Sequence, residues 1–414
     1  MIHLNLAGAT ITDSEILPVI TVLADRHHYQ LERFLHPSLR LVSYDAIAGW
    51  TMEQVRQADA LLVRTTNPVN SATLPEDSRV RFAATASAGR DHLDEAWLAR
   101  LGITVADAKG SNARSVAEYV AVAVLSVCET LEIPPAELSA GVIGAGFTGS
   151  ATADILGRIG ITCLLHDPPR EERERAAGRE TGIVSAVKQP IPGPPFQSAS
   201  LEDVLKCDII TLHVPLERTG PHATLHWLDE KKLADTPKTL VINASRGGVV
   251  DEQALVEAQQ QGQVRAFVCD VWENEPVFAD ITAQNAILAT PHIAGYSIEA
   301  KRNASEMMCV ALHRFFGLSD PEPPAARPHL QEFPEREQSL RKILEHLHPA
   351  YSYDSSLRKL IGQPDAQKGP AFLRLRQETP LRNEFSGIGL NEEILKQLPL
   401  LTKLGFRSTE AGAP

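Results

Sequence analysis

The sequence is poor in aromatic residues and short of positive charge. Phe, Trp and Tyr make up only 5% of its 414 residues, which predicts a core built mainly from aliphatic side chains and alanine. The formal net charge is −12, and this argues against a nucleic-acid-binding protein, because such a protein needs a basic face. An anionic substrate would therefore need a local group of Arg or Lys side chains.

Cysteine is also scarce, with five residues at Cys128, Cys163, Cys207, Cys269 and Cys309. They are widely spaced, odd in number and without a C-x-x-C pair, so we expect free thiols in a reducing compartment. The longest apolar stretch, near Tyr119–Cys128, is too short to span a bilayer, and the first residues lack the basic start and apolar run of a signal peptide. We therefore expect a cytoplasmic protein without membrane contact.

Several catalytic classes lack their motifs. No H-E-x-x-H motif or Cys/His group has metal-ligand spacing, so no metal site is predicted. Ser245 is not surrounded by a G-x-S-x-G elbow, and the glycine-rich run lacks the G-K-[ST] of a phosphate-binding P-loop. These absences leave dinucleotide chemistry as the reading to test.

Short apolar runs alternate with helical patterns along most of the chain, which predicts an α/β fold with parallel sheets. We expect two doubly wound domains: a flavodoxin-like substrate domain at 1–110, completed by about 290–325, and a Rossmann domain at 111–289. A proline-rich linker at 320–334 then leads to a small α+β domain at 335–414. Strands are expected at Val19–Ala24, Leu39–Val42, Ala60–Val63, Val80–Ala86, Ile103–Ala106, Gly141–Ile143, Ile161–Leu165, Asp208–Leu212, Thr239–Asn243, Ala266–Asp270 and Ile287–Ala289. Helices are expected at Tyr29–Leu35, Met52–Ala58, Ser115–Leu131, Ser150–Ile159, Asp251–Gln261, Ser297–Phe316, Gln338–Leu347 and Asn391–Leu398, and Pro168–Ser200 reads as a surface excursion.

The stretch Leu138–Pro168 carries the most specific pattern. Gly144, Gly146 and Gly149 stand in G-x-G-x-x-G spacing after an apolar strand, and a helical pattern follows them. In this fingerprint the first glycine makes the tight turn, the second lets the backbone approach a pyrophosphate, and the third lets helix and strand pack closely. Asp167 lies about twenty residues on, where an acid can bind a ribose hydroxyl pair. The pattern predicts a dinucleotide-binding site. The alternative interpretation is a glycine-rich turn that binds no ligand.

Three polar residues follow predicted strands, where ligands bind in open α/β sheets. Arg246, Glu275 and His292 could each be structural: a surface arginine, a solvated glutamate and a core histidine. Together they match an acid–base site, because a carboxylate beside a histidine orients the ring for proton exchange with a hydroxyl. The arginine would hold a substrate carboxylate and polarise the neighbouring oxygen.

Four motifs resemble those of the D-2-hydroxyacid dehydrogenase family: Gly144-Ala-Gly-Phe-Thr-Gly149, Asn243-Ala-Ser-Arg-Gly-Gly-Val-Val-Asp251, Asp270-Val-Trp-Glu-Asn-Glu-Pro276 and Thr290-Pro-His-Ile-Ala-Gly295. A second set narrows the resemblance to the branch that oxidises 4-phospho-D-erythronate on a route to pyridoxal 5′-phosphate. This set includes Ala58–Thr65, Thr85–His92, Asp94–Trp97, His166–Arg170, Thr224–His226, Leu357–Gly362 and Leu404–Phe406. The resemblance runs from about Thr21 to Phe406.

The resemblance implies an NAD-dependent oxidoreductase that acts on a small phosphorylated 2-hydroxy acid. It implies a catalytic set of Arg246, Glu275 and His292, with His292 as the acid–base group. It also implies a homodimer formed through the C-terminal domain. The expected NAD contacts are Gly144, Gly146, Phe147, Thr148, Gly149, Asp167, Val214, Ala244, Ser245, Arg246, Asp270 and Gly295. The expected substrate contacts are Thr65, Ser87 and Tyr296, to which we add Arg64 and Arg358 as candidates for the substrate's phosphate.

Two alternatives stay open at this point. The first is another D-2-hydroxyacid dehydrogenase, such as a 3-phosphoglycerate dehydrogenase. The second is a catalytically idle, NAD-sensing partner protein, which the intact Arg246, Glu275 and His292 argue against. Some positions depart from the family pattern: Met1–Pro18 reads as an extension, and Val214 stands where a threonine is common.

Overall fold

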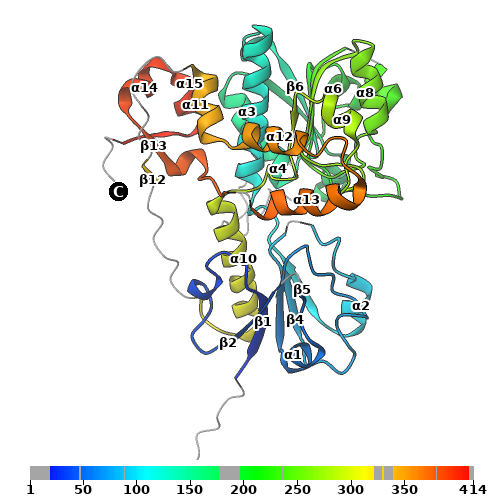
Figure 1. Cartoon of the computed structure of the whole chain (residues 1–414), viewed down its shortest axis with the longest axis vertical. Helices are drawn as coiled ribbons and strands as arrows, with labels where there is room; N and C mark the ends of the chain where they lie inside the picture. The colour runs from blue at the N-terminus through cyan, green and yellow to red at the C-terminus, as the bar shows by residue number, and fades with distance from the viewer. Residues whose placement is uncertain are drawn as a thin grey trace, which may run out of the picture. The chain divides into compact units, whose positions relative to one another are not determined.

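The computed structural model describes residues 19–45, 48–87, 89–176, 196–234, 237–320, 329–330, 339–378 and 380–409. The extension Met1–Pro18 and residues 177–195 of the predicted surface excursion lie outside the described residues. The chain divides into two compact units, Met1–Ala108 with Ser305–Pro324, and Lys109–Ala304 with Ala325–Pro414. Thus 305–324, rather than all of 290–325, belongs with the N-terminal part. Each unit is built around one large parallel sheet, and the second unit also holds a small one (Figure 1).

The first unit holds a five-stranded parallel sheet in the order β2-β1-β3-β4-β5, the flavodoxin-like order. Its strands are β1 (Thr21–Asp25), β2 (Arg40–Tyr44), β3 (Ala60–Val63), β4 (Phe82–Thr85) and β5 (Thr104–Asp107). Every residue of β3 and β4 is buried, as expected of strands covered on both faces. Helices α1 (Met52–Gln57) and α2 (Glu95–Arg100) connect strands, and α2 was not predicted.

The predicted helix at Tyr29–Leu35 is wrong, because only one 3₁₀ turn forms there, at Leu31–Arg33. The long helix α10 (Ile298–Phe316) contributes its C-terminal part to the first unit. There Met308, Cys309 and Leu312 are buried in one cluster with the β1 residues Val22 and Ala24. This packing explains why a late segment of the chain completes an N-terminal domain.

The second unit holds a six-stranded parallel sheet in the order β11-β10-β9-β8-β6-β7. Its strands are β6 (Ser139–Ile143), β7 (Thr162–His166), β8 (Ile209–Leu212), β9 (Lys238–Asn243), β10 (Val264–Cys269) and β11 (Leu288–Ala289). The strand order reverses at β6, which pairs with β7 on one side and β8 on the other. Such a switch point is where open α/β sheets bind ligands. The predicted pair of parallel α/β sheets is confirmed.

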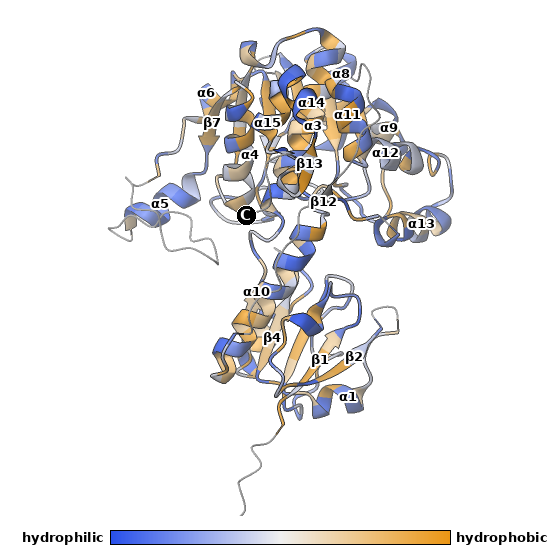
Figure 2. Ribbon diagram, turned by 90° about the vertical axis from the view of Figure 1, so that its left-hand side faces the viewer, coloured by the Kyte–Doolittle hydropathy of each residue, from blue (hydrophilic) through white to orange (hydrophobic). Residues whose placement is uncertain are grey.

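Helix α3 (Ala113–Leu131) is buried almost all round, in agreement with its alanine- and valine-rich sequence. The other helices around the sheet are α4 (Phe147–Arg158), α5 (Pro168–Ala176), α6 (Leu201–Leu205), α7 (Glu230–Ala234), α8 (Glu252–Gln260) and α9 (Asp280–Asn285). In Figure 2 the strands β4 and β1 are largely apolar, whereas α5 and α1 are strongly polar. The surface excursion predicted after Asp167 begins with helix α5, which was not predicted from the sequence.

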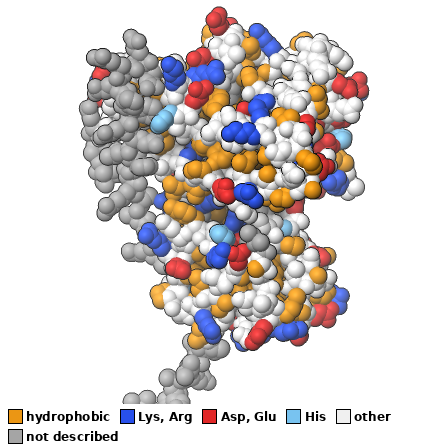
Figure 3. All heavy atoms as spheres, viewed as in Figure 1, with side chains coloured by type: hydrophobic (Ala, Val, Ile, Leu, Met, Phe, Trp, Pro, Cys, Tyr) orange, Lys and Arg blue, Asp and Glu red, His pale blue; other side chains and the backbone are white. Residues whose placement is uncertain are grey.

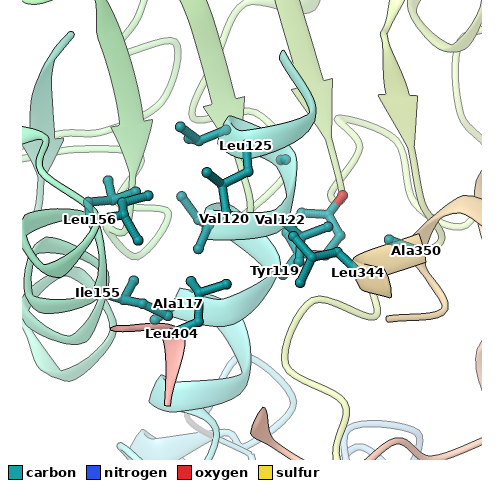
Figure 4. Packing of buried hydrophobic residues seen from close by; sticks show 14 of the residues in the cluster. Ala117, Tyr119, Val120, Val122, Leu125, Ile155, Leu156, Leu344, Ala350 and Leu404 are labelled. Carbon is teal, nitrogen blue, oxygen red and sulfur yellow. The ribbon is translucent and has the colours of Figure 1, made fainter. Parts of the chain in front are cut away.

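The C-terminal tail belongs to the second unit. It comprises α11 (Leu340–Leu347), α12 (Ala350–Arg358), α13 (Asp365–Gln377), α14 (Glu392–Gln397), α15 (Pro399–Leu404) and a small parallel sheet of β12 (His329–Leu330), β13 (Ile388–Leu390) and β14 (Arg407–Ser408). Figure 4 shows Leu344, Ala350 and Leu404 of the tail lying against α3, near Tyr119 and Ala117. These contacts place the tail in the core built around α3. The two predicted tail helices are confirmed, and α12, α13 and α15 are additional.

Candidate functional site

The glycine fingerprint forms the turn between β6 and α4, at the switch point of the sheet. Gly144 has a φ of +89°, and a Cβ there would lie 2.8 Å from the carbonyl oxygen of His213 on the neighbouring strand's end. A Cβ on Gly149 would lie 1.8 Å from the carbonyl oxygen of Gly144, so helix and strand pack too closely for any side chain. Both positions therefore require glycine for packing, as the fingerprint predicts.

Gly146 differs from the other two glycines because the space beside it is open. A Cβ there would meet no atom within 4 Å, and no side-chain hydrogen bond caps the N-terminus of α4, which starts at Phe147. Unsatisfied N–H groups at a helix N-terminus attract anions, and the open backbone leaves room for a phosphate. These residues fit the pyrophosphate of a dinucleotide. Thr148 is half-buried on the same turn, and Val214 packs against Gly144.

Asp167, at the end of β7, has a structural task in addition to the predicted ribose contact. Its Oδ2 accepts a hydrogen bond from the Ala145 N–H at 2.8 Å, and its Oδ1 accepts one from the Arg170 N–H at 2.9 Å. The Arg170 guanidinium in turn donates to the Ala145 carbonyl at 2.7 Å and pairs with Glu174 at 2.8 Å. The Asp167 carboxylate thus fixes the conformation of the glycine turn. Arg170 was not singled out, although its i+3 spacing from Asp167 is a readable signal.

The turn after β9 carries Arg246 and is organised by Asn243, a residue that sequence reasoning did not single out. The buried Asn243 side chain accepts from the Ser245 hydroxyl at 2.8 Å and donates to the Arg246 carbonyl at 3.1 Å. A Cβ on Gly247 would lie 1.7 Å from the Trp272 carbonyl, so this turn packs backbone to backbone against the segment that leads to Glu275. The half-buried Arg246 guanidinium donates to the Ser245 carbonyl at 2.9 Å.

Glu275 and His292 form a hydrogen-bonded pair. Nδ1 of His292 lies 2.8 Å from Oε2 and 3.1 Å from Oε1 of Glu275. Because a carboxylate only accepts, Nδ1 carries the proton and Nε2 is left to exchange a proton with a substrate. The Trp272 N–H also donates to Oε1 of Glu275, at 3.0 Å. The predicted pairing of these two side chains is therefore present, with Arg246 on an adjacent turn.

Electrostatics keep this pair in its charged-carboxylate form. Burial alone would raise the pKa of Glu275, but the charge and hydrogen bond of His292, together with Arg376 of α13, outweigh it and hold the pKa below its ordinary value. Arg376 Nη1 lies 4.0 Å from Oε2 of Glu275. An ionised carboxylate is what a histidine acid–base group needs beside it.

Asp270 holds the loop that presents His292 and is itself completely buried. Its Oδ1 accepts from the Thr290 hydroxyl at 2.6 Å and the Ile293 N–H at 2.8 Å, and its Oδ2 accepts from the Ala294 N–H at 2.9 Å. Burial raises the pKa of Asp270, and His292 and these hydrogen bonds oppose the rise. His292 has a φ of +58°, a left-handed conformation that only a tightly bonded loop sustains. Asp270 was predicted to contact NAD, and its carboxylate also holds this loop in place.

Gly295 was predicted to contact NAD, and the packing around it also requires a glycine. A Cβ on Gly295 would lie 2.4 Å from the Asn112 side-chain nitrogen at the start of α3. The glycine therefore lets the His292 loop close on α3. The next residue, the half-buried Tyr296, lies under the ammonium group of Lys301, 4.5 Å from its ring centroid.

The other predicted substrate residues belong mostly to the first unit. Thr65 is exposed just after β3, and Ser87, just after β4, accepts from the Gly89 N–H at 3.2 Å. Arg64 Nη1 lies 3.7 Å from the buried carboxylate of Asp25, which is a reason for a structural role.

The candidacy of Arg358 for the substrate's phosphate is not supported by its surroundings. Its Nε donates to Asp354 at 2.7 Å, and Nη1 and Nη2 donate to the carbonyls of Ala283 and Ala286 at 2.6 and 2.7 Å. The guanidinium thus binds the C-terminal carbonyls of α9, which a nearby arginine commonly satisfies. Sequence position could not show this contact, because the two segments are more than 70 residues apart.

Three properties of the described residues bear on what they could bind: surface charge, helix polarity and possible metal ligands. Figure 3 shows Lys/Arg and Asp/Glu side chains intermingled over the visible face of the described residues. Within the described ranges, every helix is too short or too polar to cross a membrane. No group of three His, Cys, Asp or Glu residues suited to a metal ion occurs in the same ranges. The described cysteines are all free thiols, and burial raises the pKa of Cys309 to about 12.

Comparison with known proteins identifies the family of this chain. Residues 129–294 match the family model described as the D-isomer specific 2-hydroxyacid dehydrogenase, NAD binding domain. The chain is 36% identical to the erythronate-4-phosphate dehydrogenase of Marinobacter nauticus, over 82% of this chain and 86% of the relative. It is 38% identical to the enzyme of the same name from Edwardsiella ictaluri, over 84% and 89%.

Solved structures with the same fold include the D-lactate dehydrogenase of Aquifex aeolicus in complex with NAD and lactic acid, with a TM-score of 0.54, 23% identity and coverage of 72% of this chain and 95% of that one. D-2-hydroxyisocaproate dehydrogenase aligns with a TM-score of 0.56 and 20% identity, over 72% and 97%. The predicted NAD-dependent dehydrogenase is thereby confirmed: the chain belongs to the D-2-hydroxyacid dehydrogenase family and groups within it with the erythronate-4-phosphate dehydrogenases.

Proposed function

We propose that this chain oxidises 4-phospho-D-erythronate to 2-oxo-3-hydroxy-4-phosphobutanoate, as a step toward pyridoxal 5′-phosphate. The observation that carries the proposal is the hydrogen-bonded Glu275–His292 pair, 2.8 Å apart, on a chain whose relatives bear the name of this reaction. When bound, NAD supplies the acceptor for the hydride that leaves C2.

The chain's own residues handle the proton and the substrate's orientation. Nε2 of His292 takes the proton of the C2 hydroxyl as the C2–H bond breaks and the C2=O bond forms. Glu275 orients the ring and stabilises its protonated form. Arg246 holds the substrate's carboxylate and polarises the C2 oxygen, for which a planar guanidinium is suited. Thr65, Ser87 and Tyr296 are the proposed further contacts to the substrate.

Substrate preference tests the specific reaction. The wild-type enzyme should turn over 4-phospho-D-erythronate with NAD at a higher kcat/KM than unphosphorylated 2-hydroxy acids or 3-phosphoglycerate. Equal kcat/KM values across this panel would contradict the proposed substrate and leave the family membership intact. Preference for 3-phosphoglycerate would favour the alternative dehydrogenase, and no turnover on any acid would favour an NAD-sensing protein.

The role of His292 is tested by substitution. We expect His292→Ala to lower kcat by at least about 100-fold, the usual scale of general acid–base catalysis, while the Kd for NAD changes little. His222→Ala is the matched control, because His222 is an exposed histidine that pairs with Glu172 at 2.9 Å. Wild-type turnover by His292→Ala would refute the assignment.

Assembly and location complete the proposal. We propose a cytoplasmic homodimer formed through the tail, as the family resemblance implies. Light scattering coupled to size-exclusion chromatography measures the assembly directly. A monomer of 45.1 kDa for the full chain, at concentrations where the enzyme is active, would contradict it.

A further inference from the structure

The tail helix α13 lies along the segment that carries Glu275. Lys368, Phe372 and Arg376 are spaced four residues apart, so they lie on one face of the helix. Lys368 Nζ bonds Asp280 at 2.6 Å, Phe372 stacks near Phe278 with 6.2 Å between centroids, and Arg376 approaches Glu275 at 4.0 Å. The helix face therefore follows the segment from Asp280 back to Glu275.

This docking is close and largely buried. Lys368 is 4% exposed and Phe372 is fully buried, and the ammonium group of Lys368 also lies 5.0 Å from the Phe278 ring centroid. A Cβ on Gly369 would lie 3.4 Å from Pro276 and 3.5 Å from Val277, so the helix backbone touches the segment next to Glu275. Two contacts therefore fix the position of α13 relative to Glu275. One is the bond of the buried Lys368 to a carboxylate, and the other is the packing of Phe372 against Phe278.

Arg376 ends this face beside the acid–base pair. Its side chain is 20% exposed, and its Nε is buried without a hydrogen-bond partner among the described residues. The charged and titratable groups that act in and around the pair are His292 on the loop after β11, Arg376 on α13, Glu252 on α8, and Asp270 and Glu273 after β10. Arg376 is thus the cation that the tail adds to a cluster otherwise composed of a histidine and carboxylates.

We propose that Arg376 is a positioning residue for the acid–base pair. From the tail, its guanidinium interacts with the Glu275 carboxylate that also binds His292, and it thereby sets the pH range over which the pair exchanges a proton with the substrate. The inference rests on the proposed function, because it requires Glu275 and His292 to be the acid–base pair. It assigns a part in the reaction to the tail, where none of the catalytic motifs lies.

The direction of the effect follows from charge. A cation near the pair favours the ionised carboxylate and disfavours addition of a further proton to the pair. Arg376 lowers the pKa of Glu275, so without Arg376 the pair takes up its proton at higher pH. The two side chains titrate as a unit, and the pH profile reports that unit.

The test compares Arg376→Met, Arg376→Lys and wild type in both reaction directions. For oxidation, the acid limb of kcat/KM should move to higher pH in Arg376→Met by about one pH unit, the low end for a charge at this distance because the site is partly exposed. For reduction of the 2-oxo acid, the basic limb should move in the same direction, because both limbs titrate the same pair. Arg376→Lys should restore most of the wild-type position.

Arg374→Met is the matched control, because Arg374 is an exposed arginine two residues away on the same helix. Arg374→Met removes the same charge at a position that does not contact Glu275, so the limbs of its pH profile should coincide with those of wild type. The position of a limb does not depend on how much of a sample is folded, so partial instability of Arg376→Met does not obscure the result.

Two results would overturn the proposal. One is a profile of Arg376→Met that superimposes on wild type. The other is a raised KM for the phosphorylated acid with unmoved limbs, which would make Arg376 a substrate contact. Failure of the proposed function looks different, because it appears as absent turnover in wild type or as retained turnover in His292→Ala.

Discussion

Replacing the buried Glu252 by glutamine should stabilise the second unit at pH 8 and have a much smaller effect on its stability near pH 5. Glu252, the first residue of α8, is 6% exposed, and its Oε1 accepts from the Glu273 N–H at 2.6 Å. Burial is the largest cause that raises its pKa to about 7, and the negative charges of Glu273 and Glu275 add to the rise. A neutral amide keeps the acceptor and removes the charge.

The sign follows from proton uptake. Below the ordinary pKa of 4.5, folded and unfolded states both hold the proton, so the group costs no stability. Between pH 4.5 and about 7 only the folded state keeps it, so stability falls as the pH rises, and above about 7 the loss is complete. At about 1.4 kcal/mol per pKa unit, the raised pKa of Glu252 lowers the free energy of unfolding at pH 8 by at most about 3 kcal/mol.

Urea unfolding followed by circular dichroism at pH 5, 6, 7 and 8 measures this dependence. The free-energy difference between Glu252→Gln and wild type should grow with pH toward about 3 kcal/mol. Glu257→Gln, on the exposed face of the same helix, should show no such growth. A difference that is equal at pH 5 and pH 8 would refute the reasoning, because it could not arise from protonation of Glu252.

Two further predictions concern the cofactor turn and the tail. Asp167→Ala should raise the ratio of kcat/KM with NADP to that with NAD, because a carboxylate at this position repels a 2′-phosphate; an unchanged ratio would mean that another group sets selectivity. Arg382→Met should lower the free energy of unfolding by about 3 kcal/mol, because it removes a 2.6 Å partner from the fully buried carboxylate of Glu118. The urea midpoint measures this loss, Arg374→Met serves as its control, and equal midpoints for the two variants would contradict the assignment.

Much of the sheet architecture and the Glu275–His292 hydrogen bond were predictable from sequence because their signals are local. The run Ala60–Val63 is wholly apolar and bounded by polar residues, and it forms β3 with the predicted bounds. Glu275 and His292 stand in short motifs directly after strands, and parallel strands bring such residues to one edge of a sheet. The predicted pairing therefore required only the fold class and the motif positions.

Other features depended on contacts between distant segments and could not be read from local patterns. Arg358 was a reasonable phosphate ligand by charge, but its partners are the carbonyls of Ala283 and Ala286 on α9. Gly295 stays a predicted NAD contact, but the close approach of Asn112, which leaves no room for a side chain there, could not be predicted from the sequence. Asp270 stays a predicted NAD contact, but its three hydrogen bonds to the His292 loop could not be read from the local sequence.

The tail also bonds to segments near two of the three places at which the chain passes between the units. The chain enters the second unit at Lys109, just before α3, and leaves it within α10, at Ser305. Glu384 of the tail accepts from the Ser115 hydroxyl of α3 at 2.9 Å and from the Ser297 hydroxyl before α10 at 3.3 Å.

The backbone adds to these contacts, because the Ile298 N–H at the start of α10 donates to the Arg382 carbonyl at 2.9 Å. Arg382 also binds Glu118 of α3, so a single tail segment holds both connecting helices at the ends nearest the His292 loop. The tail therefore bonds to both α3 and the start of α10, while its helix α13 reaches Glu275 of the Glu275–His292 pair.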